Sequence, residues 1–325
     1  MNNTTLKKIS EALGISISTV SRALKDHPDI AEKTKERVRE LADTLDYEPN
    51  TNAIQLRTKK SNLFGLIVPN VSNLFYDSFI AAVEEESRKS NYSLMILQSG
   101  DDPAIELENL KLCRQNRISG LFICISSKTN NIDAFMKLKA HDVPVIFFDK
   151  VPDTANCNKV CVADNISAQL AANIIKEKNK ERVLALFGNE QLSITKKRKE
   201  IFLQSIPKKT EVLIHHVSNS TEAEEITRDV LSQKPDTLFC MSDEILTGAM
   251  KTIQKAGLKI PTEISVIAIS NGYIPKLYYP EITYVETSGY KLGKLAFSRM
   301  KDCLDGDKSF LELSSEAILQ NGGSI

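Results

Sequence analysis

The pattern of hydrophobic and polar positions changes near residue 60. Beyond it, short apolar runs rich in β-branched residues alternate with amphipathic segments long enough for helices. Continuous apolar runs predict strands buried on both faces, and their alternation with helices predicts parallel sheets. We expect strands over 64–69, 93–97, 120–125, 143–148, 159–162, 182–187, 211–214, 237–241 and 264–269, and helices over 76–89, 104–115, 165–178, 222–233 and 244–255.

About ten strands over residues 61–325 are more than one sheet of ordinary size holds, so we expect an α/β core with two doubly wound parallel sheets. Ligands of open sheets bind beyond the carboxyl ends of the strands. Polar residues stand at those ends, although each can also serve in a turn or a helix cap. They are Asn70, Ser99, Asp149, Asp164, Asn165, Ser242, Asp243, Ser270 and Asn271.

Residues 6–24 predict two short helices joined by a tight turn. Gly14 can adopt the left-handed conformation that ends a helix, and Ser16 is a suitable N-cap for the next helix. Small polar residues early in the second helix, followed by Arg22, are typical of a helix-turn-helix, with a plain helical hairpin as the alternative. A third helix rich in Lys and Arg is expected over 31–45. The expected apolar contacts are Leu6, Ile9, Ala12, Leu13, Val20, Ala23 and Leu24.

The order of residues in this head resembles that of the lactose-repressor (LacI/GalR) family of transcription regulators. The resemblance extends over nearly the whole chain and implies a helix-turn-helix DNA-binding head over 1–46, a hinge helix or linker over 47–60 and an effector-binding core over 61–325. The core is similar to periplasmic sugar-binding proteins, with lobes at about 61–162 plus 288–312 and 163–287 plus 313–325. Further matching segments are Leu45-x-Tyr47-x-Pro49-Asn50, Ala53-x-x-Leu56-Arg57 and Gly65-Leu66-Ile67-Val68-Pro69-Asn70.

The resemblance implies a double-stranded, pseudo-palindromic DNA operator as partner. A homodimer is expected, because one short head makes too few contacts for specific binding. Leu56 would enter a base step from the minor groove and kink the duplex, with a flexible tether as the alternative for this linker. Base edges would be read by the second helix, and phosphates would be held near the helix starts. The implied DNA-binding residues are Thr5, Ser16, Ile17, Ser18, Ser21, Arg22, Asn50, Ala53 and Leu56.

The resemblance also implies a small-molecule effector, a sugar or sugar derivative, between the two lobes. Phe75 and Tyr76 match positions that pack against a sugar or purine ring, and Arg198 matches an arginine that forks onto hydroxyls or a carboxylate. A solvated basic helix face is the alternative for Arg198, because lysines flank it. An N-cap is the alternative for Asp164. The remaining implied effector-binding residues are Asp164, Ser242, Asp243 and Ser270.

Two departures from the family pattern bear on the effector. Where the family has Gly-Phe-Asp-Asp, this chain has Ala268-Ile269-Ser270-Asn271, and the family's Asn-Asp at the preceding strand end is Ser242-Asp243. Losing a carboxylate next to Arg198 would make the cleft more tolerant of anionic ligands. A neutral sugar, a sugar acid, a phosphorylated sugar and another small polar metabolite all stay open.

The sequence lacks the motifs of metal, redox and catalytic sites. The 6 cysteines lie mostly in apolar runs without a Cys-x-x-Cys pair, and His215-His216 has no nearby partner, so buried thiols and no metal are expected. There is neither a Gly-x-Ser-x-Gly elbow nor a Gly-x-Gly-x-x-Gly loop, and no Ser/His or Cys/His set stands out. We therefore expect no enzyme and no cofactor.

Charge and hydropathy bear on partners and compartment. Lys plus Arg and Asp plus Glu are equal at 42 each, which leaves room only for a local basic face. The polar start Met1-Asn2-Asn3 and the lack of an apolar run near the roughly 20 residues of a membrane span predict a cytoplasmic protein without a membrane partner. The alternatives are a transport-type sugar-binding protein, which leaves residues 6–45 unexplained, and an activator in place of a repressor.

Arg22→Ala tests the reading of bases by the second helix. The change should weaken specific DNA binding by about 1–3 kcal/mol if the guanidinium forks onto a base edge. Titrations of the operator and of unrelated DNA at several salt concentrations measure this loss. Equal weakening for every DNA sequence, with a flatter salt dependence, would reassign Arg22 to phosphate binding.

Overall fold

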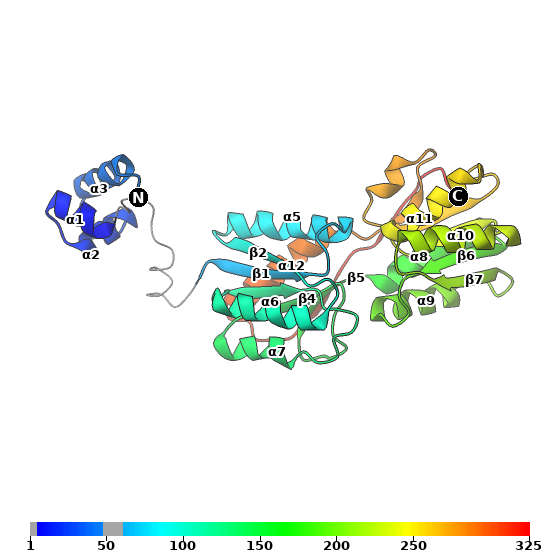
Figure 1. Cartoon of the computed structure of the whole chain (residues 1–325), viewed down its shortest axis with the longest axis horizontal. Helices are drawn as coiled ribbons and strands as arrows, with labels where there is room; N and C mark the ends of the chain where they lie inside the picture. The colour runs from blue at the N-terminus through cyan, green and yellow to red at the C-terminus, as the bar shows by residue number, and fades with distance from the viewer. Residues whose placement is uncertain (1–4, 48–60) are drawn as a thin grey trace. The chain divides into compact units, whose positions relative to one another are not determined.

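The structure is a computed structural model that describes residues 5–47 and 61–325, which belong to two compact units, 1–60 and 61–325. Three helices form the described part of the first unit: α1 (Leu6–Leu13), α2 (Ile17–Leu24) and α3 (Glu32–Thr44). They pack around a small core (Figure 1). The buried residues of this core are Ile9, Val20, Ala23, Val38 and Ala42.

The predicted head helices are confirmed, with one error in their packing. Leu6 and Leu13 pack against the buried cluster as expected, whereas Ala12 is exposed. At 3.6 residues per turn, Ala12 falls beside the stripe that Leu6, Ile9 and Leu13 form, so a methyl group there faces outward. The head therefore has a narrower apolar face than the sequence pattern suggested.

The second unit contains two lobes, each built on one six-stranded sheet. The first sheet has the order β11-β5-β4-β3-β1-β2, and all of its strands are parallel. Its strands are β1 (Leu63–Val68), β2 (Ser93–Gln98), β3 (Gly120–Ile123), β4 (Val145–Phe148), β5 (Asn158–Val162) and β11 (Glu312–Ser315). The helices of this lobe are α5 (Leu74–Lys89), α6 (Pro103–Gln115), α7 (Asp133–Met136), the 3-10 turn η1 (Lys137–His141) and α12 (Gly289–Leu304).

The second sheet has the order β12-β10-β9-β8-β6-β7, and only β12 runs antiparallel, against β10. Its strands are β6 (Arg182–Phe187), β7 (Glu211–His216), β8 (Thr237–Cys240), β9 (Ser265–Ser270), β10 (Thr283–Glu286) and β12 (Ile318–Gln320). The helices and 3-10 turns of this lobe are α8 (Asp164–Glu177), α9 (Ser193–Ser205), α10 (Ser220–Val230), η2 (Leu231–Gln233), α11 (Asp243–Lys255) and η3 (Ile274–Leu277). The predicted α/β core with two largely parallel sheets is confirmed.

The chain passes between the lobes three times, after β5, after β10 and after β11. The sequence-based boundary that gave residues 313–325 to the second lobe is wrong at its start. β11 pairs in parallel with β5, from Glu312 beside Lys159 to Ser315 beside Val162, so it belongs to the first sheet. A short mixed-polarity strand at a sheet edge lacks the apolar run that marked the central strands.

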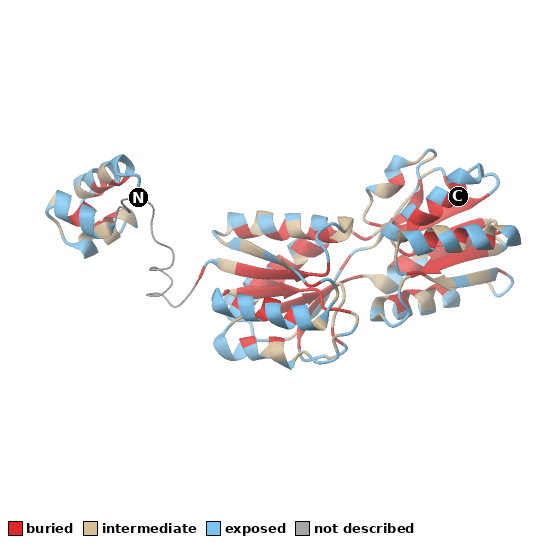
Figure 2. Ribbon diagram, viewed as in Figure 1, coloured by how far each residue is buried: buried red, intermediate tan, exposed pale blue. Residues whose placement is uncertain are grey.

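Burial follows the order of strands in each sheet. Figure 2 shows the central strands as a continuous buried layer between helices. Every residue of β3, β4 and β8 is buried, whereas the edge strands β2 and β7 mix exposed and half-buried positions. Edge strands have one unpaired side and are less fully covered, which explains their more polar residues.

The cysteines behave as buried thiols in the described chain. All six are free, and five of them are buried. Burial raises the pKa of the Cys113 thiol to about 12, so this group stays protonated and unreactive at neutral pH. Among residues 5–47 and 61–325, no cluster of three or more His, Cys, Asp or Glu could hold a metal ion, and no helix is long and apolar enough to cross a bilayer.

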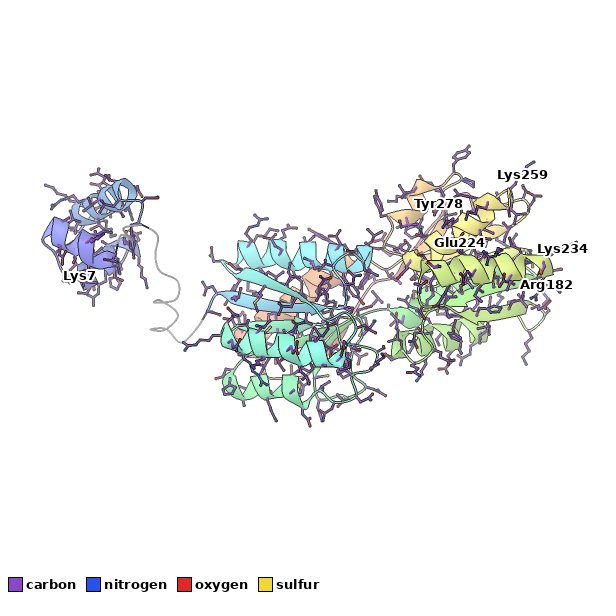
Figure 3. The ribbon with its side chains drawn as sticks, in the orientation of Figure 1. Lys7, Arg182, Glu224, Lys234, Lys259 and Tyr278 are labelled. Carbon is purple, nitrogen blue, oxygen red and sulfur yellow. The ribbon has the colours of Figure 1, made fainter. Side chains whose placement is uncertain are left out.

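Two helices of the second lobe pack unusually closely. A Cβ atom at Gly248 of α11 would lie 1.9 Å from the carbonyl oxygen of Ser220 in α10, so only glycine permits this approach. At the solvent edge of the same contact, Glu224 of α10, labelled in Figure 3, accepts hydrogen bonds from Lys251 at 2.6 Å and Lys255 at 2.7 Å.

Gly248→Ala should therefore destabilise the core although alanine favours helices. The added methyl group must push α10 and α11 apart, and overpacking of this kind costs about 1–3 kcal/mol. Thermal unfolding of the full chain measures the loss. Gln254→Ala, at an exposed position of the same helix, is the matched control and should change stability little. Equal stability of the two variants would show that the helices have room to separate.

Candidate DNA-binding head and ligand cleft

Side-chain caps set the turn of the head. The Thr5 hydroxyl accepts a hydrogen bond from the Lys8 amide at 3.4 Å at the start of α1, and the Ser16 hydroxyl accepts one from the Thr19 amide at 3.0 Å at the start of α2. Gly14 ends α1 at a φ of 66°, the left-handed conformation expected from the sequence. These caps and this glycine fix the direction in which α2 leaves the turn.

The start of α2 presents a polar, exposed surface. Ser16 Oγ lies 2.7 Å from Ser18 Oγ and 2.8 Å from Thr19 Oγ1, and Arg22 is exposed farther along the helix. Ile17 is 47% exposed, which is unusual for an isoleucine in a small domain with so little apolar surface. Of the other predicted DNA-binding residues, Ser21 is half-buried and Thr5 is exposed, whereas Asn50, Ala53 and Leu56 lie outside the described residues.

Basic residues of α3 are less available than the sequence suggested. The Lys35 ammonium group lies 3.0 Å from Asp26 and 3.3 Å from Glu32, and Arg39 lies 2.8 Å from Asp26. Lys35, through its hydrogen bond, contributes most to lowering the pKa of Asp26, which keeps this carboxylate charged. The expectation that the start of α3 holds phosphates is thus weakened, because acidic groups of the head already engage these two side chains.

The core contains a cavity of about 640 Å³ that residues of both lobes line at the carboxyl ends of their strands. This is the edge at which open parallel sheets bind ligands. A cavity of this size suits a ligand of one or two sugar rings. Six of the seven predicted effector-binding residues line it: Phe75, Tyr76, Arg198, Ser242, Asp243 and Ser270.

The wall of the first lobe combines an aromatic pair with a carboxylate. Phe75 and Tyr76 lie in the first turn of α5, with their ring centroids 5.8 Å apart. The Tyr76 hydroxyl donates a hydrogen bond to Asp149 Oδ2 at 2.8 Å. Burial raises the pKa of Tyr76, so the phenol stays protonated as the donor. Sequence analysis noted Asp149 only as a residue at a strand end, and the structure brings it into the cavity.

Arg198 is buried and paired, so the alternative of a solvated basic helix face is wrong. Its side chain is 6% exposed, and its Nη2 and Nε atoms both lie 2.8 Å from Asp164 Oδ1. Nη1 donates a further hydrogen bond to the Met241 carbonyl oxygen at 3.1 Å. The lysines that flank Arg198 in sequence point to other faces of α9, because successive helical residues are about 100° apart.

Asp164 is the one predicted effector-binding residue that is not part of the cavity lining. It is not an N-cap either, because the capping position of α8 is Ala163 and no side chain caps the helix there. Its carboxylate instead lies behind Arg198. Burial raises the pKa of Asp164, and the guanidinium of Arg198 opposes this shift. Asp164 therefore contacts the cavity lining through Arg198.

The wall of the second lobe differs from what the departures from the family pattern, at Ser242-Asp243 and Ser270-Asn271, suggested. The Ser270 hydroxyl donates a hydrogen bond to Asp243 Oδ1, and the Asn271 amide donates one to Asp243 Oδ2 at 2.8 Å. Ser242 caps α11 by accepting a hydrogen bond from the Ile245 amide at 3.4 Å. Because Arg198 has Asp164 as its carboxylate partner, the expectation of an arginine freed for anionic ligands is not supported.

Sequence analysis missed the role of Asn271, which joins the two lobes. Its side-chain nitrogen Nδ2 donates a hydrogen bond to the Leu74 carbonyl oxygen at 3.1 Å, at the start of α5. Its side-chain oxygen accepts one from the Gly289 amide at 2.9 Å, at the start of α12. An aspartate, as in the family pattern, could not donate to Leu74. The replacement of the family's aspartate by Asn271 was the feature of the sequence that could have indicated this role.

Arg198→Met tests the buried ion pair through stability alone. It leaves the Asp164 carboxylate buried without its cation, which should cost about 3–5 kcal/mol in thermal or denaturant unfolding. The double change Arg198→Met with Asp164→Leu should recover most of that loss. Arg182→Met is the matched control, because Arg182 forms an exposed ion pair with Glu211 and should cost at most about 1 kcal/mol. Equal losses for the two arginines would show that solvent reaches Asp164.

Two family models match this chain. Residues 5–50 match the model of bacterial regulatory proteins of the lacI family, and residues 61–315 match that of periplasmic binding proteins and the sugar-binding domain of the LacI family. Among similar proteins, the transcriptional repressor PurR of Vibrio atlanticus is 24% identical, with 97% of each chain covered. The sucrose operon repressor of Streptococcus mutans is 28% identical, with 86% of each chain covered.

Solved structures agree with this match. The lac repressor dimer bound to operator and an anti-inducer superposes with a TM-score of 0.87 at 20% identity, with 99% of each chain covered. At this identity the likeness supports the fold. The family models together span most of the chain and match both the helical head and the two-lobed core. The chain is therefore a DNA-binding regulatory protein of the LacI family with a ligand-binding core of the periplasmic-binding-protein type.

Proposed function

We propose that this chain is a transcriptional repressor that binds a pseudo-palindromic operator as a homodimer. A small sugar-like effector, bound between the lobes, would raise or lower its affinity for the operator. The observation that carries this proposal is that one chain contains both an exposed, hydroxyl-rich helix in its head and, in its core, a polar cavity lined by two lobes. The similar PurR and sucrose operon proteins are repressors, which favours this sense over an activator. We propose a cytoplasmic location, because the proposed DNA target lies there.

We propose that α2 reads bases. Arg22 can fork onto guanine, the hydroxyls of Ser16 and Ser18 can donate or accept, and Ile17 can contact a thymine methyl group. Thr5 and Ser21 would then hold phosphates and fix the register of the head on the duplex. In the linker, Asn50, Ala53 and Leu56 are proposed as minor-groove contacts, with Leu56 as the wedge.

We propose that the effector acts by favouring one arrangement of the lobes over another. A ligand shifts such an equilibrium only through a difference in affinity between the two arrangements. Three chain crossings and the hydrogen bonds of Asn271 join the lobes, and Leu74, which Asn271 contacts, directly precedes the effector-facing Phe75. A ligand that binds Phe75 and the wall of the second lobe would thus act on residues next to the Asn271–Leu74 hydrogen bond that joins the lobes.

Two other function classes receive less support. A transport-type binding protein would not need the helix-turn-helix head that the family model matches. An enzyme would need a nucleophile and a base in reach of each other. Neither a histidine nor a cysteine is among the residues that line the described cavity, so it holds no Ser/His or Cys/His pair. We therefore propose regulation without catalysis.

Selection of bound sequences from random DNA by the full chain tests this function. The recovered sites should be pseudo-palindromes with half-sites about one helical turn apart, because the heads of a dimer are related by two-fold symmetry. Leu56→Ala should lower affinity for the selected site and reduce its bending, while the thermal stability of the core stays unchanged. Footprints with one unrepeated half-site would contradict the dimer, and unchanged bending would make the linker a tether.

A further inference from the structure

The charges that line the cavity are unbalanced. The lining contains four carboxylates, from Asp101, Asp149, Asp243 and Glu244, and two cationic groups, from Lys150 and Arg198. Coulomb attraction and repulsion act strongly in a partly enclosed site where water is displaced. An effector must therefore enter a space with an excess of negative charge.

Both cationic groups of the lining are already engaged. Lys150 Nζ lies 2.8 Å from Asp101 Oδ1, and Asp101 also accepts a hydrogen bond from the Ser127 hydroxyl at 2.9 Å. Arg198 faces Asp164, as described above. Pairing of this kind leaves little net positive charge for a phosphate or carboxylate of a ligand.

The N-termini of α5 and α11 at the cavity could attract an anion, but residues of these two helices occupy them. Asn73 accepts a hydrogen bond from the Phe75 amide at 2.9 Å at the start of α5. Ser242 caps α11. The first turn of each helix also carries acidic residues, Asp77 in α5 and Asp243 with Glu244 in α11, which balance the positive end of the helix dipole.

Asp149 differs from the other carboxylates of the lining. Its Oδ2 accepts the Tyr76 hydrogen bond, and within residues 61–325 it has no cationic side chain within ion-pair distance. Asp243, in contrast, is held by Ser270 and Asn271, and Asp101 is held by Lys150. Glu244 is exposed at the edge. Asp149 is thus a half-buried acceptor beside the aromatic pair that forms no direct ion pair within residues 61–325.

We propose that the effector is a polyhydroxylated amine, such as an amino sugar, whose ammonium group binds the Asp149 carboxylate while its ring packs on Phe75. The inference rests on the proposed function, because it concerns the effector of the same cleft. The ammonium group supplies a positive charge at Asp149, so that Coulomb attraction adds to the hydrogen bond with the carboxylate. Asn189, Ser218 and Thr247, which also line the cavity, supply donors and acceptors for hydroxyl groups.

The test uses matched ligand sets on the full chain. Each set has a neutral parent (glucose, galactose, mannose or trehalose), its amino derivative, its 6-phosphate and its uronic acid, all titrated by calorimetry and thermal shift. We expect an amino derivative to bind about tenfold more tightly than its parent, because its ammonium group adds attraction between opposite charges to the hydrogen bond that a hydroxyl group would donate to Asp149. The phosphates and uronic acids should bind more weakly than the parents.

Asp149→Asn identifies the residue responsible. Asparagine is isosteric, can still accept the Tyr76 hydrogen bond and tolerates the left-handed backbone of Asp149, at a φ of 57°. The variant should therefore fold and bind the amine no more tightly than the neutral parent. Asp153→Asn is the control, because it makes the same charge change at an exposed residue of the same lobe outside the lining and should keep the preference.

Three results would overturn the inference: tighter binding of a phosphate or uronic acid than of its parent, an amine preference that survives in Asp149→Asn, or no binding of any amino derivative. Binding of the full chain to its selected operator is measured in parallel. Intact operator binding together with one of those results rejects only the amine effector. Loss of sequence-specific DNA binding in the wild-type chain would instead reject the proposed function itself.

Discussion

A strand in a parallel sheet must be followed by a crossover, so its carboxyl end always opens into a connecting loop. In this core two such sheets turn their loop-bearing edges to one shared cavity. The cavity side chains discussed above sit in those loops or in the first turns of the helices that follow, except Ser270, which is the last residue of β9. The central strands are buried on both faces and cannot carry polar side chains at low cost. The binding chemistry is therefore confined to this edge.

The periodicity of the sequence was enough to predict the central part of each sheet. Runs such as 182–187 and 237–241 are apolar throughout because helices cover both faces, and that pattern is visible without any tertiary information. β10, β11 and β12 were missed. These strands are only three or four residues long and lie toward one edge of their sheets, and both β11 and β12 depend on pairing with strands far away in sequence.

The cavity residues could be predicted where the type and position of a residue were enough. They could not be predicted where the role of a residue depends on its hydrogen-bond or ion-pair partners. Phe75, Tyr76 and Arg198 line the cavity as the family resemblance implied. That resemblance could not show that Asp164 lies behind Arg198, since the two residues are far apart in the chain and meet only through the packing of α8 on α9. Pairing changes the electrostatic character of the cavity, and pairing is a tertiary property.

The hydroxyl cluster at the start of α2 has a consequence for how regulation evolves. In the contacts of Ser16 with Ser18 and Thr19, either oxygen can be the donor, because each hydroxyl hydrogen rotates freely. In the proposed reading of bases by α2, a surface that can present a donor or an acceptor at the same place would accept more than one base there. Promoters would then join or leave the control of such a regulator by single nucleotide changes while the protein stays the same, and the set of regulated genes would change faster than the sequence of the protein.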